Sequence, residues 1–206
     1  MSTKLISMFC AIILVCSLVS CAKKPVLTRE ESLALRQKHL EMTQRTYSQK
    51  TPDEVLVAVD NILRLADGDY EIFHSEKGLI AKRRWSFYAV LFAAFGQDTW
   101  YISTEYTDSN STNIEIRVVS QSQGVAPMAT TNGGWTATTL PSLEDSVLSE
   151  PLYQLFYSRL DYLLGVSDIW YDCKIAKDVF DVTMKNHVEP LCFCADDENP
   201  DEHTEE

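Results

Sequence analysis

The chain has 206 residues, an apolar content of 45% and a charged content of 23%, which are ordinary values for one globular domain with its own core. Thirty acidic and 18 basic residues give a net charge of -12, and the tail 195–206 is rich in acids and contains no Lys or Arg. An acidic surface repels the phosphates of nucleic acids and of anionic lipids. Nucleic acid is therefore not expected as a partner, and a membrane must be bound by other means.

The N-terminus has the pattern of an export signal. Lys4 is the only charged residue before an apolar run over 5–19, which is shorter than the roughly 20 residues of a membrane-spanning helix. The run ends in Leu18-Val19-Ser20-Cys21, in which small or apolar residues precede a Cys. This pattern predicts a signal peptide over 1–20. The alternative is a secretory signal or an uncleaved anchor in which Cys21 is incidental.

These last four residues resemble the lipobox of bacterial lipoproteins. The resemblance implies that Cys21 carries acyl chains such as palmitate on its sulfur and on its new amine. Several acyl chains give a stable membrane anchor, whereas one chain binds only marginally. Ala22 stands where Asp favours inner-membrane retention in enterobacterial lipoproteins. The resemblance therefore implies attachment to the outer membrane, on its periplasmic face.

Helix signals lie on both sides of the chain's middle. After a lipidated tether over 21–27, Thr28 and Glu31 form a capping box at the start of a helix. Thr51 followed by Pro52 is a stronger start, and Gly68 supplies the C-terminal cap of that helix. The expected helices are 28–48, 52–67, 150–164 and part of 167–188.

Alternating apolar and polar residues predict the strands of two antiparallel hairpins, over 69–75, 79–85, 100–107 and 114–118. The very apolar run 86–96 favours a helix or an extended excursion ending at Gly96, although its aromatic residues also allow a core strand. Residues 124–142 are rich in Thr, Gly and Pro and predict a long loop, with a minor hairpin at 132–134 as an alternative.

The aromatic side chains around this apolar run are expected in the core. The functional alternative is an exposed apolar patch for a protein partner or for lipid. The side chains concerned are Trp85, Phe87, Tyr88, Phe92 and Phe95.

Together these signals predict an α+β fold. An antiparallel sheet of about four strands is packed by N- and C-terminal helices, in a single domain over 28–194. Residues 195–206 form an acidic disordered tail. There is no internal repeat.

Three Cys residues follow the anchor, namely Cys173, Cys192 and Cys194. An oxidising periplasm favours a disulfide, and Cys173–Cys192 would close a loop of roughly twenty residues. Cys173–Cys194 is the rival pairing. A metal site that adds His187 is the weaker interpretation because the Cys spacing is not that of a zinc knuckle. We expect no metal and no cofactor.

No residue pattern indicates catalysis. The four His residues are scattered, and His74 and Ser75 point to opposite faces of a strand. Lys82-Arg83-Arg84 is a basic cluster that could dock an acidic partner or a lipid headgroup, although a solvated strand end is more usual. Arg159 and Asp161 predict a polar helix face, with a buried ion pair as the alternative.

The sequence Asp69-Tyr70-Glu71-Ile72, followed by Lys77-Gly78-Leu79-Ile80-Ala81-Lys82, resembles a class of small Gram-negative α+β envelope lipoproteins. The resemblance implies a helix packed on a hairpin and brings no catalytic residues. We therefore expect a non-enzymatic binding or assembly module that acts on another envelope protein. The alternative is a carrier of an apolar ligand such as lipid, held between sheet and helices.

Overall fold

The computed structural model describes residues 27–67, 70–89, 92–107, 110–129, 132, 134–183 and 188–192. The chain divides into two units, Met1–Gln37 and Lys38–Glu206, and a helix crosses their boundary. The expected signal peptide, Cys21, Cys194 and the acidic tail lie outside the described residues.

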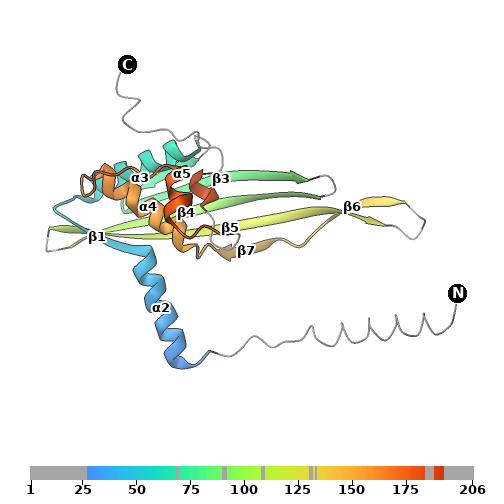
Figure 1. The fold of residues 1–206 in the computed structure, drawn as a ribbon, viewed down its shortest axis with the longest axis horizontal. Coiled ribbons are helices and arrows are strands. Elements are labelled where there is room, and N and C mark those ends of the chain that lie inside the picture. Colours follow the sequence, from blue (N-terminus) through green and yellow to red (C-terminus); the bar gives the residue numbers. More distant parts are fainter. Residues whose placement is uncertain are drawn as a thin grey trace, which may run out of the picture. The chain divides into compact units, whose positions relative to one another are not determined.

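The described residues form five helices and seven strands (Figure 1). The helices are α2 (Arg29–Thr43), α3 (Pro52–Asp67), α4 (Glu150–Leu163), α5 (Cys173–Val179) and α6 (Glu189–Cys192). The strands are β1 (Gln44–Ser48), β2 (Glu71–Ser75), β3 (Gly78–Ala89), β4 (Phe92–Thr107), β5 (Ser111–Ala129), β6 (Trp135–Thr139) and β7 (Leu143–Ser146).

All strands belong to one antiparallel sheet, in the order β1-β5-β4-β3-β2. The outer edge of β5 is also paired with β7 and, further along, with β6. The predicted α+β class with an antiparallel sheet is therefore confirmed. The expectation of about four strands is wrong, because seven are found among the described residues. The three that were missed are short segments that add to one edge of β5.

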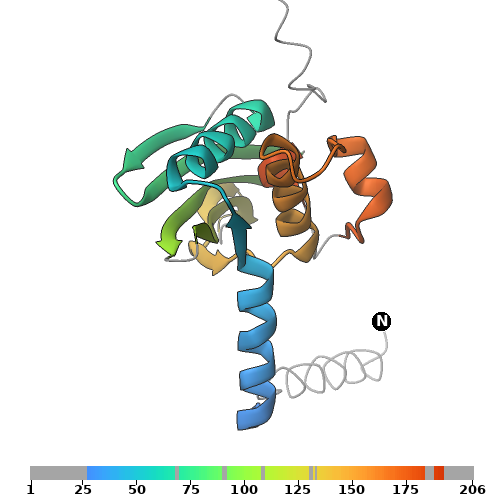
Figure 2. The same cartoon turned by 90° about the vertical axis from the view of Figure 1, so that its left-hand side faces the viewer.

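The helices gather over one half of the sheet. Helix α3 packs on β3, β4 and β5, and α4 and α6 pack beside α3 (Figures 1 and 2). Large side chains from both layers fill the space between them. Those with almost no exposed surface include Trp100, Tyr153, Phe156, Ile62, Leu63, Leu79, Ile114, Ile116, Leu152, Leu155 and Leu160.

Local signals place α3 and α4 as predicted. The Thr51 backbone N–H donates to Glu54 Oε2 at 2.8 Å, and the Glu54 N–H donates to Thr51 Oγ1 at 3.3 Å, which completes a capping box. The hydrogen bonds from Thr51 hold the pKa of the Glu54 carboxyl below its usual value. Helix α4 has Pro151 in its first turn, and Gly165 follows it with a φ of 68°.

The helix predicted over 28–48 ends earlier, at Thr43, and residues 44–48 form β1 instead. The register pairs Tyr47 with Thr112 of β5 and buries the Tyr47 side chain. Pairing with β5 satisfies the backbone groups of this segment and buries an aromatic ring, which an exposed helical turn would not do.

Two further predictions are corrected. Residues 86–89 and 92–96 are strand rather than helix, and Ser86 pairs with Phe95 in continuation of the β3–β4 ladder. Residues 124–142 are not a long loop: 125–129 and 135–139 form the hairpin that the sequence offered as the alternative, with Ala129 paired with Trp135. Extending an existing ladder satisfies every inner backbone group, so these segments stay in the sheet despite their Ala, Gly and Thr content.

Candidate functional site: an uncharged arm of the sheet

Strands β3 to β6 continue well beyond the helices (Figure 1). We call this extension the distal arm. It comprises 85–89 of β3, 92–97 of β4, 120–129 of β5 and all of β6. The other part of the same strands, which lies under the helices, is called the covered half. It comprises 79–83 of β3, 98–104 of β4 and 114–118 of β5.

The distal arm contains no charged side chain. Asp, Glu, Lys and Arg are absent from 85–97 and again from 118–143, although they make up 23% of the chain. The strand pairing places these two stretches against each other, Ala93 opposite Val125 and Ala94 opposite Gly124. The arm is therefore an uncharged extension of the sheet, assembled from two hairpins.

Large apolar side chains are exposed on both faces of the arm. On the face that carries the helices further back, Phe87 is 53% and Met128 57% exposed. On the opposite face, Tyr88 is 77% and Trp135 74% exposed. The assignment to faces follows from the alternation of side chains along each strand. The prediction that aromatics of this region form core is wrong for four side chains, because they are exposed and the helices that could cover them end before the arm begins; these are Phe87, Tyr88, Phe92 and Phe95. The fifth, Trp85, is half-buried.

One face of the arm is hollowed. Apolar side chains from four strands surround a shallow depression near the hairpin ends. Its lining includes Tyr88, Phe92, Val125, Pro127, Trp135 and Ala137. The depression offers van der Waals contact and no charge.

Two glycines let aromatic rings lie flat on the sheet. A Cβ on Gly96 would lie 2.5 Å from the ring of Trp85, and a Cβ on Gly124 would lie 3.1 Å from the ring of Phe92. The Trp85 and Phe92 rings thus occupy space that a side chain at either position would fill. This close packing gives the uncovered arm internal contacts of its own.

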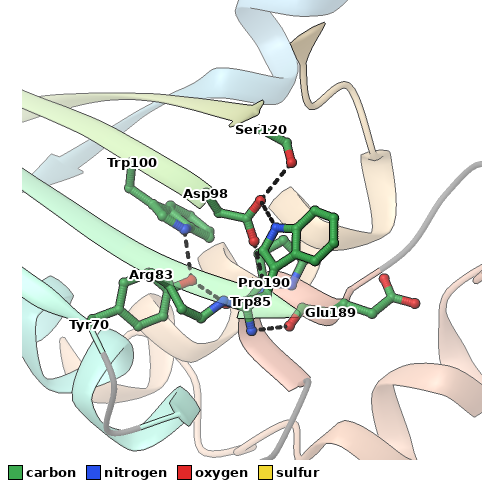
Figure 3. A network of polar contacts seen from close by, with 8 residues as sticks. All are labelled: Tyr70, Arg83, Trp85, Asp98, Trp100, Ser120, Glu189 and Pro190. Atoms are coloured by element: carbon green, nitrogen blue, oxygen red, sulfur yellow. Dashed lines mark hydrogen bonds and ion pairs between the residues drawn. The ribbon is translucent and has the colours of Figure 1, made fainter. Parts of the chain in front are cut away.

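A buried polar network marks the boundary between the covered half and the arm (Figure 3). Arg83 Nη2 donates to Asp98 Oδ2 at 2.7 Å, and both side chains are almost fully buried. Asp98 Oδ1 also accepts from Ser120 Oγ at 2.7 Å and from Trp85 Nε1 at 3.3 Å. A carboxylate with this many donors is well solvated by the protein, which offsets the cost of burying the ion pair.

The same network ties α6 to the sheet. Arg83 Nη1 donates to the backbone carbonyl of Glu189 at 2.9 Å. The Tyr70 hydroxyl donates to the Pro190 carbonyl and accepts from Trp100 Nε1 (Figure 3). The basic cluster Lys82-Arg83-Arg84 is therefore not a free patch, because Arg83 points into the protein and pairs with Asp98.

The disulfide expected between Cys173 and Cys192 is present and joins α5 to α6. Arg159 of α4 lies beside it, with Nη2 3.3 Å from Cys173 Sγ and Nε donating to the Tyr171 carbonyl at 2.9 Å. Arg159 is buried, so the predicted polar helix face is wrong at this position. Through these contacts the guanidinium of Arg159 links α4 to the C-terminal segment.

Asp161 does not pair with Arg159. Its carboxylate accepts from the Tyr47 hydroxyl at 2.8 Å and from Arg45 Nη1 at 2.6 Å, both on β1. Burial, followed by the charge of Asp161, raises the pKa of Tyr47. Burial likewise raises the pKa of Tyr157, whose hydroxyl donates to the Thr43 carbonyl at 2.7 Å.

The described histidine contacts are on the surface. His74 Nε2 lies 3.1 Å from Asp60 Oδ1, and Arg64 donates to both Asp60 oxygens. Three or more His, Cys, Asp or Glu side chains do not gather into a metal-binding group anywhere in the described part of the chain. His187, named in the alternative metal site, lies outside the described residues.

The sequence contains one signal for the arm, which is its lack of charge. The two charge-free stretches 85–97 and 118–143 are visible without a structure. Their pairing is not, because β4 and β5 are joined through a turn far from the arm. Only the tertiary structure brings them side by side.

The comparisons with known proteins return nothing. No protein-family model, no curated protein and no solved structure matches the chain. Within the described residues, every helix is too short or too polar to cross a membrane.

Proposed function

We propose that the protein is a lipid-anchored, non-enzymatic binding or assembly module of the cell envelope. Acyl chains on Cys21 hold it at the periplasmic face of the outer membrane, and the distal arm is its binding surface. The observation that carries the proposal is the exposure of large apolar side chains on an uncharged arm. Extended apolar patches of this kind mark interaction sites on soluble domains.

The covered half together with the helices on it, which we call the body, is filled, whereas the arm is exposed, and this division supports a binding role. The space between helices and sheet is occupied by fully buried side chains such as Trp100 and Phe156. Arg83, Asp98 and Arg159, the charged groups in the interior, are engaged in contacts that hold the C-terminal helices. What the body contributes is a support for the arm.

The expected occupant of the arm is another envelope protein. The alternative function, carriage of an apolar ligand such as lipid, is favoured by the shallow apolar depression beside Tyr88 and Trp135. The carrier requires a ligand space between sheet and helices, and the tight core there argues against it. Carriage of an apolar ligand is therefore the second candidate function, after binding of an envelope protein.

Photo-crosslinking in intact cells tests the arm. A photoreactive amino acid at Phe87, Tyr88 or Trp135 should give adducts with an envelope component. Matched positions are Tyr101 and Tyr106, which are also exposed aromatics of the sheet but lie outside the arm. Adducts at the control positions and none on the arm would contradict the proposal.

The anchor is tested separately. Cys21→Ala should abolish incorporation of labelled palmitate and release the protein from the membrane fraction. Cys194→Ala is the matched control and should leave labelling unchanged. Acylation that persists in Cys21→Ala would show that the lipobox interpretation is wrong.

A further inference from the structure

The apolar character of the distal arm is concentrated at its far end, which we call the arm tip. Within the part of the chain that the structure describes, the tip consists of the adjoining ends of β3, β4, β5 and β6, and its most exposed large side chains are Tyr88, Trp135 and Met128. Tyr88 lies on one face and Met128 on the other. A flat protein partner would cover only one of these faces. A medium that surrounds the tip would cover both.

Polarity changes in three steps along the arm. Behind the tip, the neutral polar residues Ser86 and Gln123 flank Phe95 in a narrow belt. Exposed charges return two residues further back, where Arg84 pairs with Gln97 and Glu144 pairs with Gln121. From Gln123 to Met128 the strand advances about 17 Å at roughly 3.3 Å per residue. An apolar end, a neutral belt and a charged base match the passage from lipid to interface to water.

We propose that the arm tip inserts into the interfacial layer of a zwitterionic phospholipid bilayer. Trp135 and Tyr88 suit this layer, because each has a large apolar ring with a polar group that can stay hydrated. The inference goes beyond the proposed function, because it assigns the tip of the arm to lipid rather than to another envelope protein. It rests on that function only for the anchor at Cys21, which holds the arm within reach of a bilayer.

Backbone pairing limits the depth of insertion. Strand β2 pairs with β3 only from Gly78 to Lys82, so in the described part of the chain the outer edge of β3 along the arm has no neighbouring strand. Unpaired backbone groups are very costly in hydrocarbon and tolerable where water penetrates. The tip therefore belongs among the headgroups and upper acyl chains.

Charge selects the lipid. With a net charge of -12, the protein is repelled by anionic headgroups, and the arm offers no Lys or Arg to overcome this. Contact with lipid must then come from apolar burial, which electrostatic screening by salt does not weaken. Phosphatidylcholine and phosphatidylethanolamine are the expected surfaces, and added phosphatidylglycerol should not improve contact.

Tryptophan quenching tests the inference on the full chain. The protein is isolated from cell membranes with its N-terminus as the cell leaves it and reconstituted on phosphatidylcholine–phosphatidylethanolamine vesicles. Phosphatidylcholine brominated in its acyl chains quenches only indole rings that touch lipid. We expect strong quenching, most of which Trp135→Phe removes. The matched control Trp170→Phe should retain it, because Trp170 lies beside Arg159 in the body.

A second pair of variants guards against a local effect at Trp135. Tyr88→Ser with Met128→Ser should reduce the quenching of Trp135 severalfold, whereas Tyr101→Ser with Tyr106→Ser should leave it unchanged. Phosphatidylglycerol that increases quenching would contradict the charge argument.

The outcomes separate this inference from the proposed function. Protein that floats with the vesicles while Trp135 is equally bright on brominated and ordinary lipid overturns the insertion and leaves the anchor intact. A photoreactive group at Trp135 that captures an envelope protein instead of lipid overturns the insertion and supports the binding module. Protein that fails to float overturns both.

Discussion

Strands β3, β4 and β5 run through two different environments in this molecule. In the covered half they bury Leu79, Trp100 and Ile116 under α3 and α4. In the distal arm the same strands expose Phe87, Phe92 and Phe95. Both halves have the same strand order and the same antiparallel register. The difference shows that apolar residues in a strand do not by themselves define a core; a second layer must be available to cover them.

The largest expected effect comes from truncating one aromatic side chain in each half, which tests this contrast directly. Trp100→Ala should lower the free energy of unfolding by about 3–5 kcal/mol, because it removes a fully buried ring and leaves a cavity. Phe87→Ala should change it by less than about 1 kcal/mol, because that ring is already half exposed. Urea denaturation measures both values. Equal losses would mean that the arm is covered in solution.

The boundary between the halves gives the next prediction. Asp98→Ala should cost about 3–5 kcal/mol of unfolding free energy, because Arg83 would remain buried without its counter-charge. Replacing both residues, with Arg83→Met and Asp98→Leu, should recover much of this loss. A double-mutant cycle by urea denaturation gives the coupling energy. A coupling near zero would show that the buried pair does not define the boundary.

The disulfide tests the part of the molecule that carries the helices, because it joins α5 to α6. Cys173→Ala should lower the free energy of unfolding by about 3 kcal/mol, since the bridge closes a loop with a sequence separation of 19. The thiol count by mass spectrometry after alkylation should rise accordingly. Cys194→Ala is the control and should not change stability. If Cys194→Ala has the larger effect, the rival pairing with Cys173 forms in solution.

The smallest effect concerns alkaline pH. Burial raises the pKa of Tyr47, Tyr153 and Tyr157, so each ionises more readily in the unfolded chain. Their contribution to stability is complete below the unfolded value of about 10 and declines as the pH rises above it. Tyr157→Phe should make that decline shallower. Urea midpoints measured between neutral pH and about pH 11 test this, and Tyr88→Phe, on the exposed arm, is the control.

Sequence patterns predicted the helices best where local chemistry is decisive. The capping box at Thr51 and the apolar face of α3 led to correct boundaries, because caps and periodicity act within one or two turns. The same reasoning failed at 44–48, where pairing with β5 overrides helix propensity. It failed again at 86–96, because an apolar run looks alike in a buried helix and in a strand.

The candidate site was harder to predict than the fold. The exposed-patch alternative named Phe87 and Tyr88 but neither Trp135 nor Met128, and burial was the default expectation for the side chains that it named. Arg83 is the reverse case, because its neighbours Lys82 and Arg84 suggested a surface cluster while register placed it opposite Asp98. Neither outcome can be read from neighbours in sequence. Both depend on which face of the sheet the helices cover and on where that cover ends.

The amino-acid sequence alone determined the acidic balance, the caps of the helices, the alternation of the strands and the absence of charge from 85–97 and 118–143. These properties are local, because they depend on residue chemistry and short-range spacing. The tertiary structure alone decided that the two charge-free stretches pair, that Arg83 is buried and that the aromatics of the arm are exposed. These properties are non-local, because burial depends on contacts between segments that are distant in the chain.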